Sequence, residues 1–155
     1  MQAHDVEQVL AIEQRNFQEP WTKRAFLAEI AASHISQPLV LEYRDQIIGY
    51  VVPWFVADEM QIATIAIHED FRRRGLARQI MIHLCELAQQ RHCRVVHLEV
   101  RQSNSAARQL YESLGFQTTG ERREYYGVKE NALLMSKNLN FDSVESMERR
   151  SDGLV

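Results

Sequence analysis

The 155-residue sequence is poor in cysteine and proline, with only two cysteines and three prolines. Cys85 and Cys93 lie eight residues apart and form no C-x-x-C pair. Neither a disulfide framework nor a zinc knuckle is therefore indicated. The six histidines are scattered without metal-ligand spacing, so we expect no metal site.

Long apolar segments and a strong charge of either sign are also absent. No apolar run approaches the ~20 residues that a membrane-spanning helix needs. The opening residues, MQAHDVEQVL, lack the basic start and apolar core of a signal peptide. We therefore expect a cytoplasmic protein with no membrane partner. A net charge of −3 argues against a protein that coats nucleic acid, so no direct nucleic-acid binding is expected.

The length is that of one domain, and residues 1–139 are interpreted as that domain. Residues 140–155 are polar and carry no apolar stripe, which predicts a flexible tail. The expected elements are helices over 5–17 and 22–32, strands over 39–43, 47–56 and 60–68, a helix over 75–91, a strand over 93–100, a helix over 104–114, and two antiparallel strands joined around YGVKEN (126–131). This order predicts an α/β (α+β) fold, in which helices cover both faces of a mixed sheet.

Several local features are expected within these elements. Asp5 and Thr22 are predicted N-caps, and Pro53 predicts a bulge or a free edge in its strand because proline lacks an N–H donor. The helix over 75–91 is expected to place one apolar stripe on the sheet, formed by Leu76, Ile80, Leu84 and Leu87.

A basic turn, DFRRRGLARQI (70–80), stands between the third strand and the long helix. The first turn of a helix has four unpaired N–H donors and a partial positive charge. Gly75 lets an anion approach the backbone, and the arginines can add charge-assisted hydrogen bonds. The turn thus predicts a site for a compact anion such as pyrophosphate. The alternative is a solvated surface run in which Gly75 only eases a turn. Neither G-x-G-x-x-G nor G-x-x-x-x-G-K-[ST] is present.

RRRGLA (72–77) is similar to the R/Q-x-x-G-x-G/A signature of the GNAT acetyltransferases, whose loop holds the pyrophosphate of acetyl-CoA. LEVRQSNSAARQLYESLGF (98–116) resembles the second cofactor-contacting segment of that family. The resemblance implies a GNAT-type central sheet, mixed, mostly antiparallel and twisted, and acetyl-CoA as co-substrate. The cofactor-binding residues that it implies are Ile65, Ala66, Ile67, Arg72, Arg73, Arg74, Gly75, Leu76, Ala77, Arg78 and Asn104. The alternative for Asn104 is a helix cap.

Within this family the chain resembles the N-terminal acetyltransferases of a small-subunit ribosomal protein. The similar segments are IEQ (12–14), PW (20–21), LEVRQSN (98–104) and EYY (124–126). The resemblance implies transfer of an acetyl group to an N-terminal alanine, with a ribosomal protein as partner. One departure lies in the last hairpin, where Glu130, Asn131 and Ala132 stand in place of the usual E-D-A.

Glu99 and Tyr111 are the candidate catalytic residues. Glu99 lies in an apolar strand, which is expected to raise the pKa of its carboxyl toward that of a useful base. The alternative is a solvated carboxylate or one paired with Arg101 or Arg122. Tyr111 shares a helical stripe with apolar residues and could be a core tyrosine. The resemblance implies that Glu99 is the general base and that Tyr111 is the general acid at the coenzyme A sulfur.

An α-amino group suits one modest base better than lysine does, because freeing a lysine amine costs about 3.5 kcal/mol more. By resemblance, Tyr125 and Tyr126 line the acceptor site; edge-strand aromatics are the alternative. Two other functions remain open. One is acetylation of a small amine, and the other is a non-catalytic acyl-CoA sensor.

Overall fold

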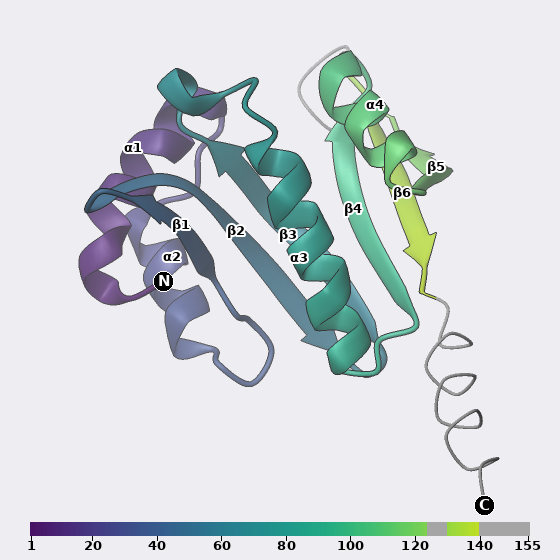
Figure 1. The fold of residues 1–155 in the computed structure, drawn as a ribbon, viewed down its shortest axis with the longest axis horizontal. Coiled ribbons are helices and arrows are strands. Elements are labelled where there is room, and N and C mark those ends of the chain that lie inside the picture. Colours follow the sequence, from purple (N-terminus) through teal and green to yellow (C-terminus); the bar gives the residue numbers. More distant parts are fainter. Residues whose placement is uncertain (124–129, 140–155) are drawn as a thin grey trace, which may run out of the picture.

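In the computed structural model, which describes residues 1–123 and 130–139, helices cover both faces of one six-stranded sheet (Figure 1). The elements are η1 (Ala3–Asp5), α1 (Val6–Asn16), α2 (Lys23–Ala31), β1 (Leu39–Tyr43), β2 (Gln46–Val56), β3 (Glu59–Ile67), η2 (Glu69–Phe71), α3 (Leu76–Gln90), β4 (Val95–Arg101), α4 (Ser105–Ser113), β5 (Gln117–Arg122) and β6 (Ala132–Asn138). The predicted fold class is confirmed. Tyr125, Tyr126 and the tail 140–155 lie outside the described residues.

The strand order is β1-β2-β3-β4-β6-β5, and only β3 and β4 pair in parallel. The other neighbouring strands are antiparallel. The predicted helix over 75–91 is the crossover that joins the parallel pair, as such connections require. The sheet is therefore mixed and mostly antiparallel, as expected.

Two apolar clusters hold the helices to the sheet. The first lies under α3 and α4, where Met81, Leu84 and Tyr111 pack on β3, β4 and β6. The second lies under α1 and α2, where Val9 and Phe26 pack on β2. Figure 1 shows α3 and α4 in front of the sheet and α1 and α2 behind its β1–β3 half.

The bulge predicted at Pro53 is confirmed, and the strand that contains it begins at a tight turn. A two-residue turn at Arg44 and Asp45, both with positive φ, joins β1 to β2, which is the geometry that suits a tight hairpin. The register of β2 against β3 shifts between Val52 and Pro53. The ladder of β2 with β1 ends at Val51, before Pro53, and single contacts from residues 35–37 continue along that edge, such as the Gln37 N–H that donates to the Pro53 carbonyl.

Two local predictions are wrong. Asp5 does not cap α1 with its side chain, because its carboxylate accepts the Gln2 N–H at 2.6 Å and closes the short η1 turn instead. The stripe of α3 is rotated by about one residue: its fully buried residues are Met81, Leu84 and Ala88. The small Ala88 and the flexible Met81 lie against the sheet beside Leu84. The other predicted residues, Leu76, Ile80 and Leu87, are only partly buried.

No helix of the described part of the chain is long and apolar enough to cross a membrane. Within residues 1–123 and 130–139, no group of three or more His, Cys, Asp or Glu side chains could hold a metal ion.

Candidate active site

The basic turn leads from β3 directly to the start of α3. Gly75 is the N-cap residue of α3 and has φ 75°, a conformation that favours glycine. The space beside it is open, since a side chain there would meet no heavy atom within 4 Å. The first amides of α3 receive no side-chain cap. This helix start thus offers free donors to an anion, as the sequence predicts.

The four arginines of the turn differ in their partners. Arg72 donates to the Asn16 amide oxygen on α1 at 2.8 Å, and Arg78 donates to the Ser113 hydroxyl on α4 at 2.7 Å. Arg74 donates to the Asp70 carbonyl at 3.3 Å and lies 5.2 Å from the Phe71 ring centroid. Arg73 is exposed and has φ 61°. Two of the arginines thus join the turn to neighbouring helices as well as carrying charge.

β3 and β4 separate beside this turn. Their parallel ladder runs from Glu59 paired with Val95 to Ile62 paired with Leu98, although the strands continue to Ile67 and Arg101. A cavity of about 170 Å³ lies between the separated segments. Its lining includes Ile65, Glu99, Asn104 and Tyr111. Four predicted site residues from two strands and one helix therefore meet at one place.

Glu99 projects from β4 on the face opposite α3 and α4. Val96, Leu98 and Val100 fill the other face of the strand and are buried. The Glu99 carboxylate pairs with the Arg122 guanidinium at 3.1 Å, and its side chain is 20% exposed. Of the alternatives left open by the sequence, the pair with Arg122 is therefore the one that forms. The Glu99 side chain is thus partly buried, is paired with a cation, and lines the cavity between β3 and β4.

Tyr111 and Asn104 come from α4. Tyr111 is 8% exposed and lies 6.0 Å from Phe116, measured between ring centroids. It is both a core tyrosine and a lining residue of the cavity. The Asn104 side chain accepts the Ala107 N–H at 3.2 Å and caps the helix, so the cap alternative is confirmed. Its position beside the cavity leaves the cofactor role compatible with the cap.

A larger cavity, of about 1030 Å³, adjoins the first and shares Glu99 with it. Its lining combines aromatic side chains (Phe17, Trp21, Trp54), acids (Glu13, Glu19, Glu99), bases (Arg101, Arg122) and the segment from Gln61 to Thr64. The Trp21 and Trp54 rings stack with centroids 6.5 Å apart. Glu99 lines both cavities and is therefore shared by the small cavity and the large one.

Glu13 is the site residue that the sequence analysis missed. It is 1% exposed, and burial raises the pKa of its carboxyl to about 7, although the Trp21 N–H bond acts in the opposite direction. One signal was available: Glu13 follows Val6 by seven residues and Val9 by four, and both spacings place it on the apolar face of α1. A carboxylate on the buried face of an amphipathic helix needs hydrogen-bond donors.

The residues just before β6, in its connection with β5, contact the end of β4. Glu130 accepts a hydrogen bond from the Ser103 hydroxyl and pairs with Arg101 at 3.0 Å. These contacts lower the pKa of the Glu130 carboxyl, the hydrogen bond from Ser103 most of all. Asn131, the departure from E-D-A, donates its amide to the Glu121 carboxylate. An aspartate at 131 could not donate there and would repel Glu121.

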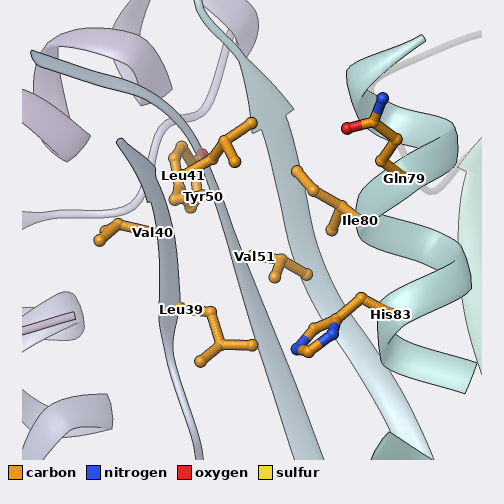
Figure 2. Close-up of a pocket in the computed structure, with 8 residues that line it drawn as sticks. All are labelled: Leu39, Val40, Leu41, Tyr50, Val51, Gln79, Ile80 and His83. Carbon is orange, nitrogen blue, oxygen red and sulfur yellow. The ribbon is translucent and has the colours of Figure 1, made fainter. Parts of the chain in front are cut away.

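A further cavity, of about 290 Å³, lies away from these residues, between β1, β2 and α3 (Figure 2). Leu39, Val51 and Ile80 make it largely apolar, and Gln79 and His83 on α3 are its polar side chains. No predicted site residue lines it. Glu99 and Tyr111 thus meet in the cavity of about 170 Å³, and Glu99 alone of the two also lines the cavity of about 1030 Å³.

The chain is similar to known acetyltransferases over most of its length. The sequence model of the acetyltransferase (GNAT) family matches residues 6–116. The [ribosomal protein bS18]-alanine N-acetyltransferase of Salmonella typhimurium is 36% identical over 128 residues, which cover 81% of this chain and 85% of that protein. The Escherichia coli protein of the same name is 32% identical over 139 residues, covering 88% and 93%. A crystal structure of the E. coli ribosomal-protein-S18-alanine N-acetyltransferase superposes with a TM-score of 0.84 at 30% identity, over 91% of this chain and 92% of that one.

Proposed function

The chain belongs to the GNAT family of acetyltransferases, and from that premise we propose that it acetylates the α-amino group of a protein N-terminus. The acceptor proposed first is the N-terminal alanine of a small-subunit ribosomal protein. The names of its relatives support this choice, as does a cavity beside Glu99 that is large enough for the end of a peptide chain. The observation that carries the proposal is the meeting of Glu99, Asn104 and Tyr111 in the gap between β3 and β4.

Acetyl-CoA fits the donor side of this site. The uncapped start of α3 and the exposed arginines would hold its pyrophosphate. The backbone of Ile65–Ile67 and the Asn104 side chain would hold the pantetheine arm along the separated part of β3. When bound, acetyl-CoA supplies the thioester that carries the acetyl group.

Glu99 acts as the general base in the proposed reaction. It removes a proton from the acceptor ammonium, so that the free amine attacks the thioester carbonyl carbon and forms the new C–N bond. Arg122, 3.1 Å away, keeps the carboxylate oriented toward the cavity wall and balances its charge while the acceptor is absent. Base catalysis of this kind contributes typically 10²–10⁴-fold to a rate.

Tyr111, which lines the smaller cavity together with Glu99, serves as the general acid. As the C–S bond breaks, its hydroxyl donates a proton or a hydrogen bond to the leaving sulfur. A phenol with a pKa near ~10 is a weak acid toward a thiolate whose conjugate acid has a pKa near ~8.5. The hydrogen bond is therefore the larger part of its contribution.

The proposed acceptor side is the 1030 Å³ cavity. Its aromatic walls and its mixture of acids and bases suit a short peptide segment with a polar backbone. Tyr125 and Tyr126, which lie outside the described residues, are proposed as further contacts to the peptide.

The test is release of free thiol from acetyl-CoA in the presence of short acceptor peptides. We expect turnover with a peptide that begins with alanine, and little with the same sequence carrying a blocked N-terminus and an internal lysine. A matched peptide that begins with methionine measures the preference for alanine. Equal turnover with the blocked peptide would point to lysine acetylation. Turnover only with a small diamine such as putrescine would replace the peptide acceptor by a small amine.

A further inference from the structure

Glu13 is the one acidic or basic side chain that is fully buried among residues 1–123 and 130–139. It lies in the last turn of α1, and the proposed chemistry does not use it. Burying a carboxyl group costs free energy unless donors satisfy its oxygens. Its retention in an otherwise apolar cluster therefore calls for an explanation in terms of what it contacts.

Both oxygens of Glu13 accept a hydrogen bond. The Trp21 backbone N–H donates to Oε1 at 2.9 Å, and the Tyr50 hydroxyl donates to Oε2. Trp21 belongs to the loop between α1 and α2, and Tyr50 is buried in the middle of β2. One side chain thus joins the end of α1, the following loop and the sheet.

This loop is a wall of the larger cavity. Phe17, Gln18, Glu19 and Trp21 all line it. Trp21 also stacks on Trp54, whose indole N–H donates to the Glu29 carboxylate at 2.8 Å. Glu99 lines the same cavity from β4. The position of the loop therefore determines the shape of the space in front of the proposed base.

We propose that Glu13 is a positioning residue for the acceptor: its contacts with Trp21 and Tyr50 hold the 17–22 loop so that the cavity presents the acceptor amine to Glu99. The inference rests on the proposed function, since it assigns this cavity to the acceptor. Of the loop residues, Phe17 also lines the smaller cavity, whereas Gln18, Glu19 and Trp21 line only the larger one. The pyrophosphate site proposed at the start of α3 contains no residue of this loop, so the loss of Glu13 acts mainly on the acceptor.

The first test is the steady-state kinetics of Glu13→Ala with each substrate varied in turn. Small displacements of positioned groups cost as much as 10²-fold, and we expect the acceptor KM to rise about 10-fold or more. The KM for acetyl-CoA should stay within about 2-fold of wild type. Glu13→Gln keeps an amide oxygen that can accept the Trp21 N–H and should restore most of the loss. Tyr50→Phe removes one of the two donors and should shift the acceptor KM in the same direction by a smaller factor.

Gln8→Ala is the matched control. Gln8 also lies on α1 and also accepts a backbone N–H from β2, that of Ile47 at 3.0 Å, but it does not line the cavity. Its loss should lower the melting temperature without changing the acceptor KM. The inference is overturned if Gln8→Ala raises the acceptor KM as Glu13→Ala does, or if Glu13→Ala changes both substrate KM values equally.

Hydrogen exchange provides a readout that needs no substrate. The Trp21 amide should exchange faster in Glu13→Ala than in wild type, and it should be unchanged in Gln8→Ala. Unchanged Trp21 exchange in Glu13→Ala would overturn the inference whatever the acceptor is. If the wild type acetylates only a small amine, the peptide proposal fails. The same comparison of KM values with that amine still tests Glu13.

Discussion

The proposed donor side and the proposed acceptor side of the site are built in different ways. The proposed pyrophosphate site of the donor side is a short continuous segment, from the end of β3 to the first turn of α3, and its arginines lie at the surface. The acceptor side gathers Glu13 from α1, Trp54 from β2, Glu99 from β4 and Arg122 from β5. Local backbone geometry is enough to make an anion site, whereas the placement of a base and its acceptor depends on how distant elements pack.

Glu99→Gln should separate the two sides most clearly. The amide cannot take the proton from the acceptor ammonium, so kcat should fall by about 10²–10⁴-fold. The affinity for acetyl-CoA, measured by calorimetry, should change little because Glu99 lies outside the basic turn. A variant with nearly normal kcat and an unchanged pH profile would remove Glu99 from the mechanism.

The buried acid of the acceptor side should be visible in folding. The pKa of Glu13 is about 7 in the folded protein, against an ordinary value of 4.5. Its contribution to stability is therefore fully present below about pH 4.5 and is lost as the pH rises to 7. This loss amounts to about 3 kcal/mol at ~1.36 kcal/mol per pH unit.

Urea unfolding at several pH values checks this contribution. The stability of Glu13→Gln relative to wild type should increase by about that amount between pH 4.5 and 8. Gln14→Ala, at an uncharged and exposed position of the same helix, is the control and should show a nearly constant difference. A constant difference for Glu13→Gln as well would show that its carboxyl titrates normally.

The surface charge of the donor side should affect only the cofactor. Arg73→Ala combined with Arg74→Ala removes two exposed guanidinium groups beside the α3 amides. The Kd for acetyl-CoA should rise about 10-fold, less so in high salt because exposed charges are screened. Arg24→Ala, an exposed arginine on α2, should leave the Kd unchanged. Equal Kd values for the double variant and wild type would show that these arginines are a solvated surface run and do not bind the cofactor.

The two N-cap residues offer the smallest and most closely matched comparison. Asn104→Ala and Thr22→Ala each remove a side-chain acceptor from a helix start, which costs about 1 kcal/mol. Both should lower the melting temperature by a few degrees. Only Asn104→Ala should also raise the KM for acetyl-CoA, by several-fold. If neither variant affects that KM, Asn104 is a cap alone.

The same contrast explains which features could be predicted from the sequence. The caps at Thr22 and Asn104 depend on a few neighbouring residues and were predicted correctly. So was the set of elements that brings Glu99 and Tyr111 to one cavity, because hydrophobic periodicity indicated their order along the chain.

The features that could not be predicted depend on long-range packing. Glu13 and Tyr50 are 37 residues apart in the chain, and no local pattern indicates their hydrogen bond. The choice of Arg122 as the partner of Glu99 depends on how β5 pairs with β6, which in turn lies beside β4. The buried stripe of α3 depends on the exact rotation of the helix on the sheet, which places Met81 and Ala88 inward.

The short parallel ladder of β3 and β4 has a consequence for the sheet as a whole. Four residue pairs, from Glu59–Val95 to Ile62–Leu98, join a three-stranded half, β1-β2-β3, to another, β4-β6-β5. A molecule that lies in the gap beyond these pairs and bonds to both strands completes the seam between the halves. Because it binds the folded state alone, it also stabilises that state in proportion to the logarithm of its concentration. A ligand bound in the gap between β3 and β4 is thus expected to stabilise the contact between the two halves of the sheet.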